Sequence, residues 1–238
     1  MFEERIYRRD YMSDDLKGFE VVVKETDLYI CAKTDLSSEA IGSALKYRAH
    51  LEEYIEKHPQ FQTSLKPLSF DLFAPPIVKE MFAASNAAGV GPMASVAGTI
   101  AEFVGRDLLK YSDEVIIENG GDIFIKSRKK RKLGIYAGDS SFSNRLVIEI
   151  DGAKTPLGVC TSSATIGPSL SFGKTDATVV ICRSAALADA CATAIGNIVK
   201  EPGDMKEAFE FAKKINGVIG ILIILKDRLG VWGDVKLI

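Results

Sequence analysis

Histidine is scarce in this chain of 238 residues, in which only His50 and His58 occur. Neither lies near the polar motifs described below, so the sequence gives poor support to a Ser-His triad or a His-rich zinc site. The most apolar stretch, Val218–Leu225, has eight residues and cannot span a bilayer. The N-terminus has mixed charge and lacks the apolar core of a signal peptide. We therefore expect a soluble, cytoplasmic protein with no membrane partner.

The cysteine pattern argues against two further kinds of site. The chain has four cysteines, and no two of them have the CxxC spacing of a zinc or redox motif. We expect all four thiols to be free, and mostly buried, because a free cysteine behaves as a small core residue. The four are Cys31, Cys160, Cys182 and Cys191.

Neither sign of charge is in excess, since 30 Lys and Arg face 32 Asp and Glu, for a formal net charge of −2. This balance gives no reason to expect a nucleic-acid partner. The basic run 128–132 has no interleaved aromatic side chains to stack bases, and we interpret it as the solvated tip of a hairpin. With 47% hydrophobic residues the chain can bury a core without disulfide bonds or a structural metal, and we assign residues 1–238 to one domain.

Apolar periodicity predicts a mixture of strands and helices. Residues 19–33 are expected to form a hairpin, followed by a helix that Ser37 or Ser38 caps and His58 ends. Residues 1–58 would thus form an N-terminal extension of hairpin and helix. The other expectations are irregular chain at 59–74, helices at about 76–85, 92–111, 185–200 and 204–214, and strands at 114–118, 121–126, 132–137, 145–150, 157–161, 177–182, 218–225 and 229–236. Tight turns between successive strands imply antiparallel pairing, so the predicted fold class is α+β, with antiparallel β-sheets packed with helices.

The strongest local motif is Glu118-Asn119-Gly120-Gly121-Asp122, which lies between two apolar runs. Two glycines allow the backbone a sharp turn and let a ligand approach its N–H groups. Asp122 would then stand at the edge of a site, where it can accept a hydrogen bond from a hydroxyl or a ring N–H. The alternative is an ordinary hairpin turn with Asn-Gly at its centre, and spacing alone favours that alternative.

A second motif lies in the predicted helix 185–200. Asp189 and Thr193 are four residues apart and so share one face of the helix. A carboxylate and a hydroxyl on one face can share a hard cation such as Mg²⁺. Water molecules and substrate phosphates then serve as the remaining ligands of the cation. The alternative, which spacing alone favours, is an Ala-rich helix packed on a sheet with Asp189 near its N-terminus.

Two weaker motifs could also bind a ligand. The glycine loop that includes Gly91 opens a helix, and free N–H groups at a helix start bind phosphate. This loop matches neither the Walker pattern nor a full GxGxxG. The hydroxyl groups of Thr161, Ser162 and Ser163 follow a predicted strand, where they can bind a ligand or satisfy a turn.

In combination these motifs resemble a known family. Gly-Gly-Asp-Ile at 120–123, Thr-Ser at 161–162 and Ala-Asp-Ala-Cys-Ala-Thr-Ala at 188–194 follow in the order seen in the ApbE-like superfamily. That superfamily includes FAD:protein FMN transferases, which are Mg²⁺-dependent enzymes that split FAD and attach FMN to a Thr or Ser of a target protein. The chain looks most like a UPF branch of this superfamily, and residues 89–200 would be the motif-bearing core of a single ApbE-like domain.

The resemblance implies a role for each matching residue. It makes Asp189 and Thr193 both the Mg²⁺ ligands and the catalytic pair. It also implies that the residues that bind the cofactor, FAD or FMN, include Gly98, Gly120, Gly121, Asp122, Thr161 and Ser162. The local motifs add Gly91, Asn119 and Ser163 to the residues expected to bind it.

The chain departs from the transferases at groups that hold phosphate charge. They usually carry a lysine directly before the glycine that matches Gly98, and Ala97 stands there in this chain. They also carry a His…Asp-Pro-Arg-Thr-Gly segment before the next strand. Residues 167–177 read GPSLSFGKTDA instead, in which Lys174 is the one basic residue that could partly substitute.

The resemblance therefore implies a protein that binds a flavin or related nucleotide with Mg²⁺ and, if it is an enzyme, transfers a flavin-phosphate group. Two alternatives stay open: a non-catalytic protein that binds a phosphate-bearing small molecule or a protein partner, and an enzyme of other chemistry in the same cleft. We also expect a homodimer, because pairing the apolar strands near the C-terminus with a two-fold mate would cover a sheet edge.

Overall fold

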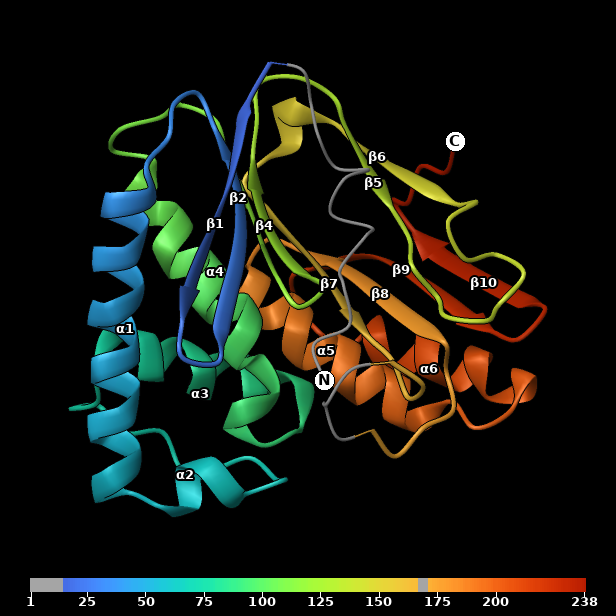
Figure 1. The fold of residues 1–238 in the computed structure, drawn as a ribbon. Coiled ribbons are helices and arrows are strands. Elements are labelled where there is room, and N and C mark those ends of the chain that lie inside the picture. The colour runs from blue at the N-terminus through green and yellow to red at the C-terminus, as the bar shows by residue number, and fades with distance from the viewer. Residues whose placement is uncertain (1–14, 167–170) are drawn as a thin grey trace.

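The computed structural model describes residues 15–166 and 171–238. Its fold is α+β, as the sequence predicts, with helices packed on one face of a large antiparallel sheet (Figure 1). The eight strands of this sheet lie in the order β1-β2-β3-β4-β7-β8-β9-β10. Their bounds are Lys17–Val23 (β1), Thr26–Ala32 (β2), Val115–Asn119 (β3), Asp122–Lys126 (β4), Leu157–Ser162 (β7), Ala177–Cys182 (β8), Val218–Leu225 (β9) and Arg228–Gly233 (β10).

A second, two-stranded sheet covers part of the other face. It consists of β5 (Arg131–Gly134) and β6 (Val147–Ile150), which the chain inserts between the directly paired β4 and β7. The molecule therefore has two apolar cores, one between the helices and the large sheet and a smaller one between the two sheets. The smaller core borders the site described below.

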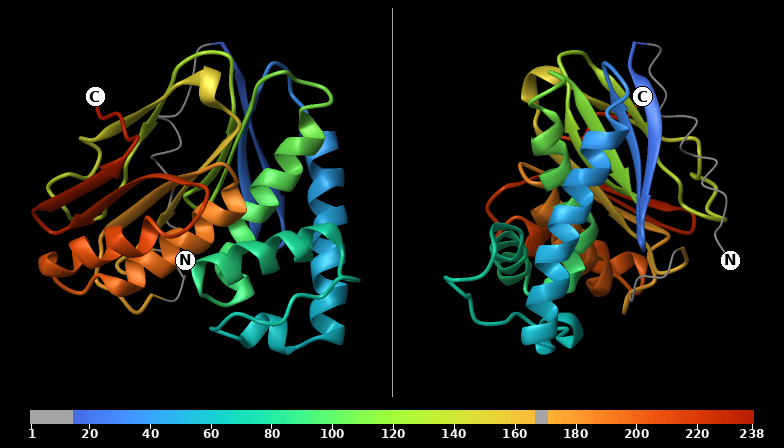
Figure 2. Two further views of the ribbon diagram at one scale, coloured as in Figure 1. Left: turned by 180° about the vertical axis from the view of Figure 1, so that it is seen from behind. Right: turned by 60° about the vertical axis from the view of Figure 1, so that its left-hand side comes forward.

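The helices lie together on one side of the large sheet, which Figure 2 shows from behind. They are α1 (Ser37–Lys57), α2 (Gln60–Thr63), α3 (Pro76–Ala88), α4 (Val96–Leu108), α5 (Ala185–Ile198) and α6 (Met205–Ala212). A 3₁₀ turn, Pro92–Ser95, leads into α4, so the helix predicted over 92–111 is divided in two. α4 packs on β3 and β4, α5 packs on β7 and β8, and the two helices contact each other. This pairing of α4 with α5 positions the site.

Two details of the N-terminal half differ from the sequence prediction. α1 begins without a serine cap, because Asp35 Oδ1 accepts a hydrogen bond from the Ser37 N–H (3.1 Å) and Leu36 is the N-cap residue. The segment 59–74, expected to be irregular, contains the short helix α2. Its Phe61 is fully buried, and this apolar anchor explains why a brief polar helix is held against the larger ones.

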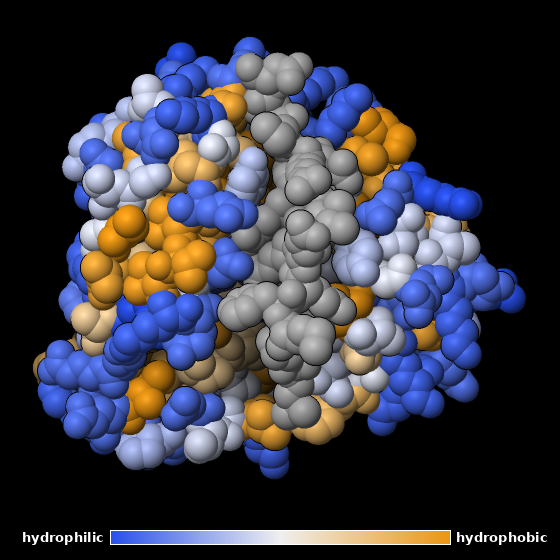
Figure 3. Space-filling model, viewed as in Figure 1, coloured by the Kyte–Doolittle hydropathy of each residue, from blue (hydrophilic) through white to orange (hydrophobic). Residues whose placement is uncertain are grey.

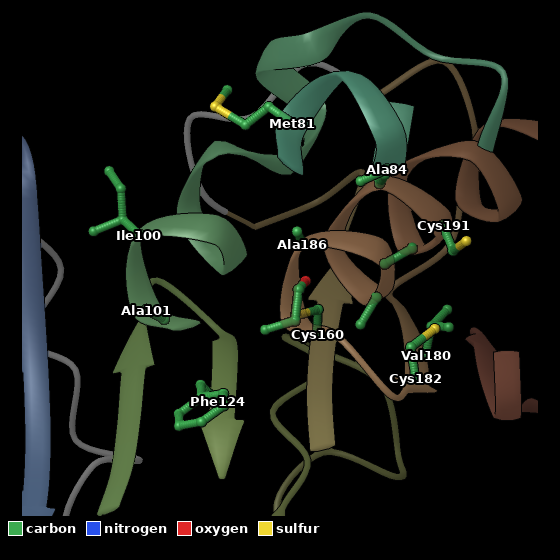
Figure 4. Close-up of a cluster of buried hydrophobic side chains, with 14 of the residues drawn as sticks. Met81, Ala84, Ile100, Ala101, Phe124, Cys160, Val180, Cys182, Ala186 and Cys191 are labelled. Atoms are coloured by element: carbon green, nitrogen blue, oxygen red, sulfur yellow. The ribbon is translucent and has the colours of Figure 1, made fainter. Parts of the chain in front are cut away.

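Small side chains let α5 approach the large sheet closely (Figure 4). Ala186 and Cys191 of α5 belong to the same core as Cys160 and Cys182 of the strands beneath. A Cβ atom at Gly158 of β7 would overlap the backbone of α5, so glycine is needed there. All four cysteines are free and buried, in agreement with the expectation from the sequence.

No single helix in the described part of the chain combines the length and the apolar composition that crossing a bilayer requires. The bent pair of Pro76–Ala88 and Pro92–Leu108 reaches that length only when its two parts are added, and they meet at 101°. The cytoplasmic location expected from the sequence stays a prediction.

The large sheet has its two edges at β1 and β10. An apolar surface patch covers the region of α1 and β1 in Figure 3, and the exposed apolar side chains of these elements are Val22, Ile41 and Leu45. At the other edge, Leu229 and Val231 of β10 are exposed as well. Both edges present apolar surface, and the homodimer stays a prediction.

Candidate functional site

The Gly-Gly motif forms the hairpin turn between β3 and β4. The two strands pair through Asn119 and Asp122, so only Gly120 and Gly121 connect them. Both glycines have positive φ, 66° and 101°, which suits a two-residue hairpin turn and which residues with a Cβ adopt at a cost. The hairpin alternative from the sequence is therefore correct, but the centre of the turn is Gly-Gly and not Asn-Gly.

The backbone of this turn offers less to a ligand than the sequence suggests. The Gly121 N–H donates a hydrogen bond to Oε1 of the buried Glu118 (2.7 Å). The expectation of exposed N–H groups at the turn is thus wrong for Gly121. Glu118 was missed as a positioning residue, although an acidic side chain at the end of an apolar strand, before a glycine pair, was an available signal.

Asp122 shows the clearest sign of a missing partner. Its side chain is 8% exposed, and its Oδ1 is buried with no hydrogen-bond partner among residues 15–166 and 171–238. Burial raises the pKa of Asp122 well above its usual range, and the neighbouring Asp189 carboxylate raises it further. Hydrogen bonds from Cys160 and Thr161 oppose the rise. Because an unpaired buried oxygen costs free energy, this atom is suited to accept a ligand or a cation.

Asp189 of α5 holds the start of α4. Its Oδ2 accepts a hydrogen bond from the Gly98 N–H (2.9 Å), and the Ala97 N–H also stabilises the carboxylate. These N–H groups belong to the first turn of α4 and have no partner within the helix. Burial raises the pKa of Asp189 to about 7, although the two N–H groups act to lower it. A Cβ at Gly98 would lie only 2.8 Å from Asp189 Cβ, so glycine permits this contact.

Glu102 makes the reciprocal contact, from α4 to the start of α5. It is buried, and its Oε2 accepts hydrogen bonds from the Ser184 hydroxyl (2.9 Å) and the Ala185 N–H (2.7 Å). Each helix thus contributes a carboxylate to the N-terminus of the other, where negative charge is favoured. Sequence reasoning missed Glu102, and the available signal was an acidic residue within the otherwise small and apolar run 96–105.

These segments surround a cleft of about 970 Å³, a volume that includes the open space at its entrance. The apolar lining belongs to the core between the two sheets and consists of Ile123, Leu133, Ile135, Ile148, Val159 and Val179, with Ile166 and Tyr136 beside them. The polar lining comes from the β3–β4 turn, the end of β7 and α5. A space between stacked sheets with polar groups on one side suits a planar ring that carries a polar substituent.

Every site residue predicted from the sequence lines this cleft, except Gly91, Gly98 and Asn119. Two of these three support its wall: Gly98 contacts α5, and Asn119 Nδ2 donates a hydrogen bond to the Ala97 carbonyl (3.0 Å). Gly91 lies elsewhere, since a Cβ there would overlap the backbone at Ser64. The apolar lining was not predicted, because only tertiary packing brings β5 and β6 over the large sheet.

The oxygen donors in the cleft suit a hard cation. Asp122, Asp189 and Thr193 all line it, and Mg²⁺ is commonly held by one or two carboxylates together with water and phosphate. Within the described residues there is no group of three or more His, Cys, Asp or Glu that could hold a metal. A site with so few protein ligands fits Mg²⁺ better than zinc, and the unpaired Oδ1 of Asp122 is the observation that supports this fit.

Known sequences show what this chain is similar to. A family model described as AbpE bacteria matches residues 9–224. The UPF0280 protein of Methanothrix thermoacetophila is 45% identical over 214 residues, covering 89% of this chain and 90% of that protein. The UPF0280 protein of Methanocella arvoryzae is 40% identical over 215 residues, covering 89% of this chain and 86% of that protein.

Solved structures agree with the architecture. The apo form of Pseudomonas stutzeri flavinyl transferase ApbE superposes with a TM-score of 0.61 at 14% identity, covering 93% of this chain and 95% of that chain. Flavin transferase ApbE from Vibrio cholerae superposes with a TM-score of 0.58 at 12% identity, covering 91% and 96%. At these identities the similarity is one of fold.

Proposed function

Because the chain belongs to the family described as AbpE bacteria, we propose that its cleft binds a flavin or related nucleotide together with Mg²⁺. The observation that carries the proposal is the buried, unpaired Oδ1 of Asp122, close enough to Asp189 for the two carboxylates to interact, in a cleft with an apolar lining. The structural neighbours are flavin transferases by name, which supports a flavin as the ring.

Each part of the cleft has a role in this proposal. Asp189 and Thr193 would ligate Mg²⁺, with Asp122 as a further oxygen donor. When bound, Mg²⁺ supplies positive charge that neutralises and polarises a phosphate. The apolar lining would hold the ring and exclude water from its faces, and the hydroxyl groups of residues 161–163 would bind polar atoms of the ligand.

The same site supports either flavin-phosphate transfer or binding alone. Ala97 favours binding alone, since the transferases carry a lysine there and its charge would assist a phosphate. Incubation with FAD and Mg²⁺ distinguishes the two. Release of AMP would identify an enzyme, and the fate of FMN names the reaction: FMN attached to a protein hydroxyl means transfer, and free FMN means attack by water. Intact bound FAD would identify a binding protein.

Replacing Asp189 by asparagine tests the proposed metal ligand. Asparagine keeps an oxygen that can accept the Gly98 N–H and removes the charge, so the fold is expected to persist while Mg²⁺-dependent binding of FAD weakens by about tenfold or more, about 1.4 kcal/mol. Flavin fluorescence titration with Mg²⁺ measures this change, and circular dichroism checks the fold.

Asp113→Asn is the matched control, because Asp113 is exposed and pairs only at the surface with Arg128. It should leave the dissociation constant of FAD unchanged. Wild-type affinity in Asp189→Asn would remove Asp189 from the metal site, and equal losses in both variants would mean that general charge and not this site governs binding.

The raised pKa of Asp189 makes metal-dependent binding sensitive to pH. Below about pH 7 the carboxyl group is protonated in the metal-free protein, and Mg²⁺ must displace that proton. The apparent affinity for Mg²⁺ with FAD should therefore rise by about tenfold per pH unit between pH 5.5 and 7 and level off above pH 7. Titrations across this range in wild type and Asp189→Asn measure it, and a flat wild-type profile would contradict the assignment.

The same group should affect stability in the absence of metal. The folded-state pKa lies above the ordinary value of 3.8, so the contribution of Asp189 to stability is fully present below pH 3.8 and is lost as pH rises through about 7. In EDTA the melting temperature of wild type should therefore fall relative to that of Asp189→Asn between pH 5.5 and 8. Added Mg²⁺ should reverse part of the fall at pH 8 but not at pH 5.5.

A further inference from the structure

The described residues that line the cleft include acids and no bases. Asp122 and Asp189 are its charged side chains, and no Lys, Arg or His is among the lining residues within 15–166 and 171–238. Residues 167–170, which follow the lining residue Ile166 in the chain, are Gly-Pro-Ser-Leu and add no charge by sequence. The described side chains of the cleft therefore provide no positive charge to a phosphate.

The backbone N–H groups of the glycine turn and of the start of α4 do not replace the missing basic side chains. A glycine turn and a helix N-terminus both bind anions through free N–H groups. Here the Gly121 N–H donates to Glu118, and the Gly98 N–H at the start of α4 donates to Asp189. Carboxylates of the protein itself occupy the positions in which a phosphate would be held.

We propose that the cleft binds the uncharged ring and polyol chain of a flavin directly, and admits phosphorylated flavins only in complex with a divalent cation. This inference rests on the proposed function and goes beyond it, because it separates two ligand classes by their dependence on the metal. The apolar lining contacts the ring regardless of cations, whereas a phosphate would face two acidic side chains, Asp189 and Asp122, and no basic side chain among the described lining residues. Mg²⁺ would supply the positive charge that the lining lacks.

Titration of riboflavin, FMN and FAD, each in EDTA and in Mg²⁺, tests the proposal. Riboflavin should bind with a dissociation constant that Mg²⁺ changes by less than about twofold. In EDTA, FMN and FAD should bind at least about tenfold more weakly than riboflavin, and Mg²⁺ should remove that difference. Equal binding of FMN and riboflavin in EDTA would overturn this inference and leave the proposed function standing. Failure of all three flavins to bind under either condition would overturn both.

Asp189→Asn should change the affinity for FMN in opposite directions in EDTA and in Mg²⁺. At pH 8, above the pKa of about 7 of Asp189, removal of the negative charge should strengthen FMN binding in EDTA by about threefold or more. In Mg²⁺ the same variant should bind FMN more weakly, because a metal ligand is lost. For riboflavin, the ratio of the dissociation constants in EDTA and in Mg²⁺ should stay near one. A purely structural role of Asp189 would instead weaken all three measurements together, and that result would overturn the proposal.

A second variant guards against a fold defect in the first. Ser162→Lys adds a cation to the polar lining of the cleft at a partly exposed position. It should make FMN binding in EDTA approach that of riboflavin, with no need for Mg²⁺. Ser141→Lys, at an exposed position that does not line the cleft, is the control and should leave FMN binding metal-dependent. Metal dependence that persists unchanged in Ser162→Lys would contradict the proposal.

Discussion

Replacement of Gly98 by alanine is expected to destabilise the protein by about 2–4 kcal/mol, because α4 and α5 cannot both keep their positions around a methyl group. The added Cβ would overlap the Ala185 carbonyl oxygen and lie 2.8 Å from Asp189 Cβ. Both neighbours are firmly held, since one is backbone and the other is the first carbon of a hydrogen-bonded side chain. The helices must separate, which also weakens the bond between Asp189 and the Gly98 N–H.

Gly42→Ala is the matched control, because Gly42 lies within α1 and a Cβ there would meet no atom within 4 Å. That substitution should stabilise the protein by about 0.5–1 kcal/mol, through helix propensity and reduced freedom of the unfolded chain. Urea denaturation of the two variants and wild type measures both effects. A neutral Gly98→Ala would mean that the α4–α5 contact is more adaptable than the structure indicates.

Loss of the Glu114 carboxylate should have the largest effect, a destabilisation of about 3–5 kcal/mol in Glu114→Ala. Glu114 is fully buried at the start of β3, where Oε2 accepts from Arg131 (2.9 Å) and Oε1 pairs with Lys33 (2.8 Å). Arg131 is itself buried and joins β5 to this network. Removal of the Glu114 carboxylate leaves the buried Arg131 guanidinium with Asp15 as its remaining acidic partner among the described residues.

Comparison with Asp113→Ala isolates the role of burial, since the two residues are adjacent and Asp113 forms only a surface pair. The control should cost less than about 1 kcal/mol. Burial would raise the pKa of Glu114, but hydrogen bonds from Lys33 and Ser127, with others, hold it well below its usual range.

Since that pKa is lower in the folded chain, the stabilisation by Glu114 is fully present above about pH 4.5 and is lost as pH falls. The difference in unfolding free energy between wild type and Glu114→Gln should therefore shrink from pH 6 to pH 3. A difference that is constant over this range would exclude the ionised carboxylate as its source.

Much of the fold could be predicted because its strand pairing is mostly local. β1 with β2, β3 with β4 and β9 with β10 are hairpins, which alternating apolar residues and turn residues indicate directly. The ApbE-like resemblance, drawn from the order of three short motifs, is confirmed by the family model and by the fold of the structural neighbours. The pairing of β4 with β7 across the inserted β5 and β6 is not local, and no sequence pattern specifies it.

The candidate site was predictable only in its polar half. Asp189 and the 120–122 turn could be named because small and polar residues interrupt apolar runs. Glu102 and Glu118 could not be assigned a role, since their hydrogen bonds depend on which N–H groups the tertiary structure brings near. The apolar lining is indistinguishable in sequence from ordinary core, because residues such as Ile123 and Leu133 satisfy the same strand pattern in either setting.

The exchange of carboxylates between α4 and α5 bears on how such a site would be inherited. Asp189 anchors the first turn of α4 whether or not it ever meets a metal, so a descendant that abandoned its chemistry would still be selected to keep an acid or amide at this position. Among the described contacts, Thr193 and the unpaired Oδ1 of Asp122 have no comparable structural role. Substitutions at these two positions would therefore be tolerated once binding is lost. Among related proteins that have lost the function, we therefore expect Thr193 and Asp122 to be substituted before Asp189 is.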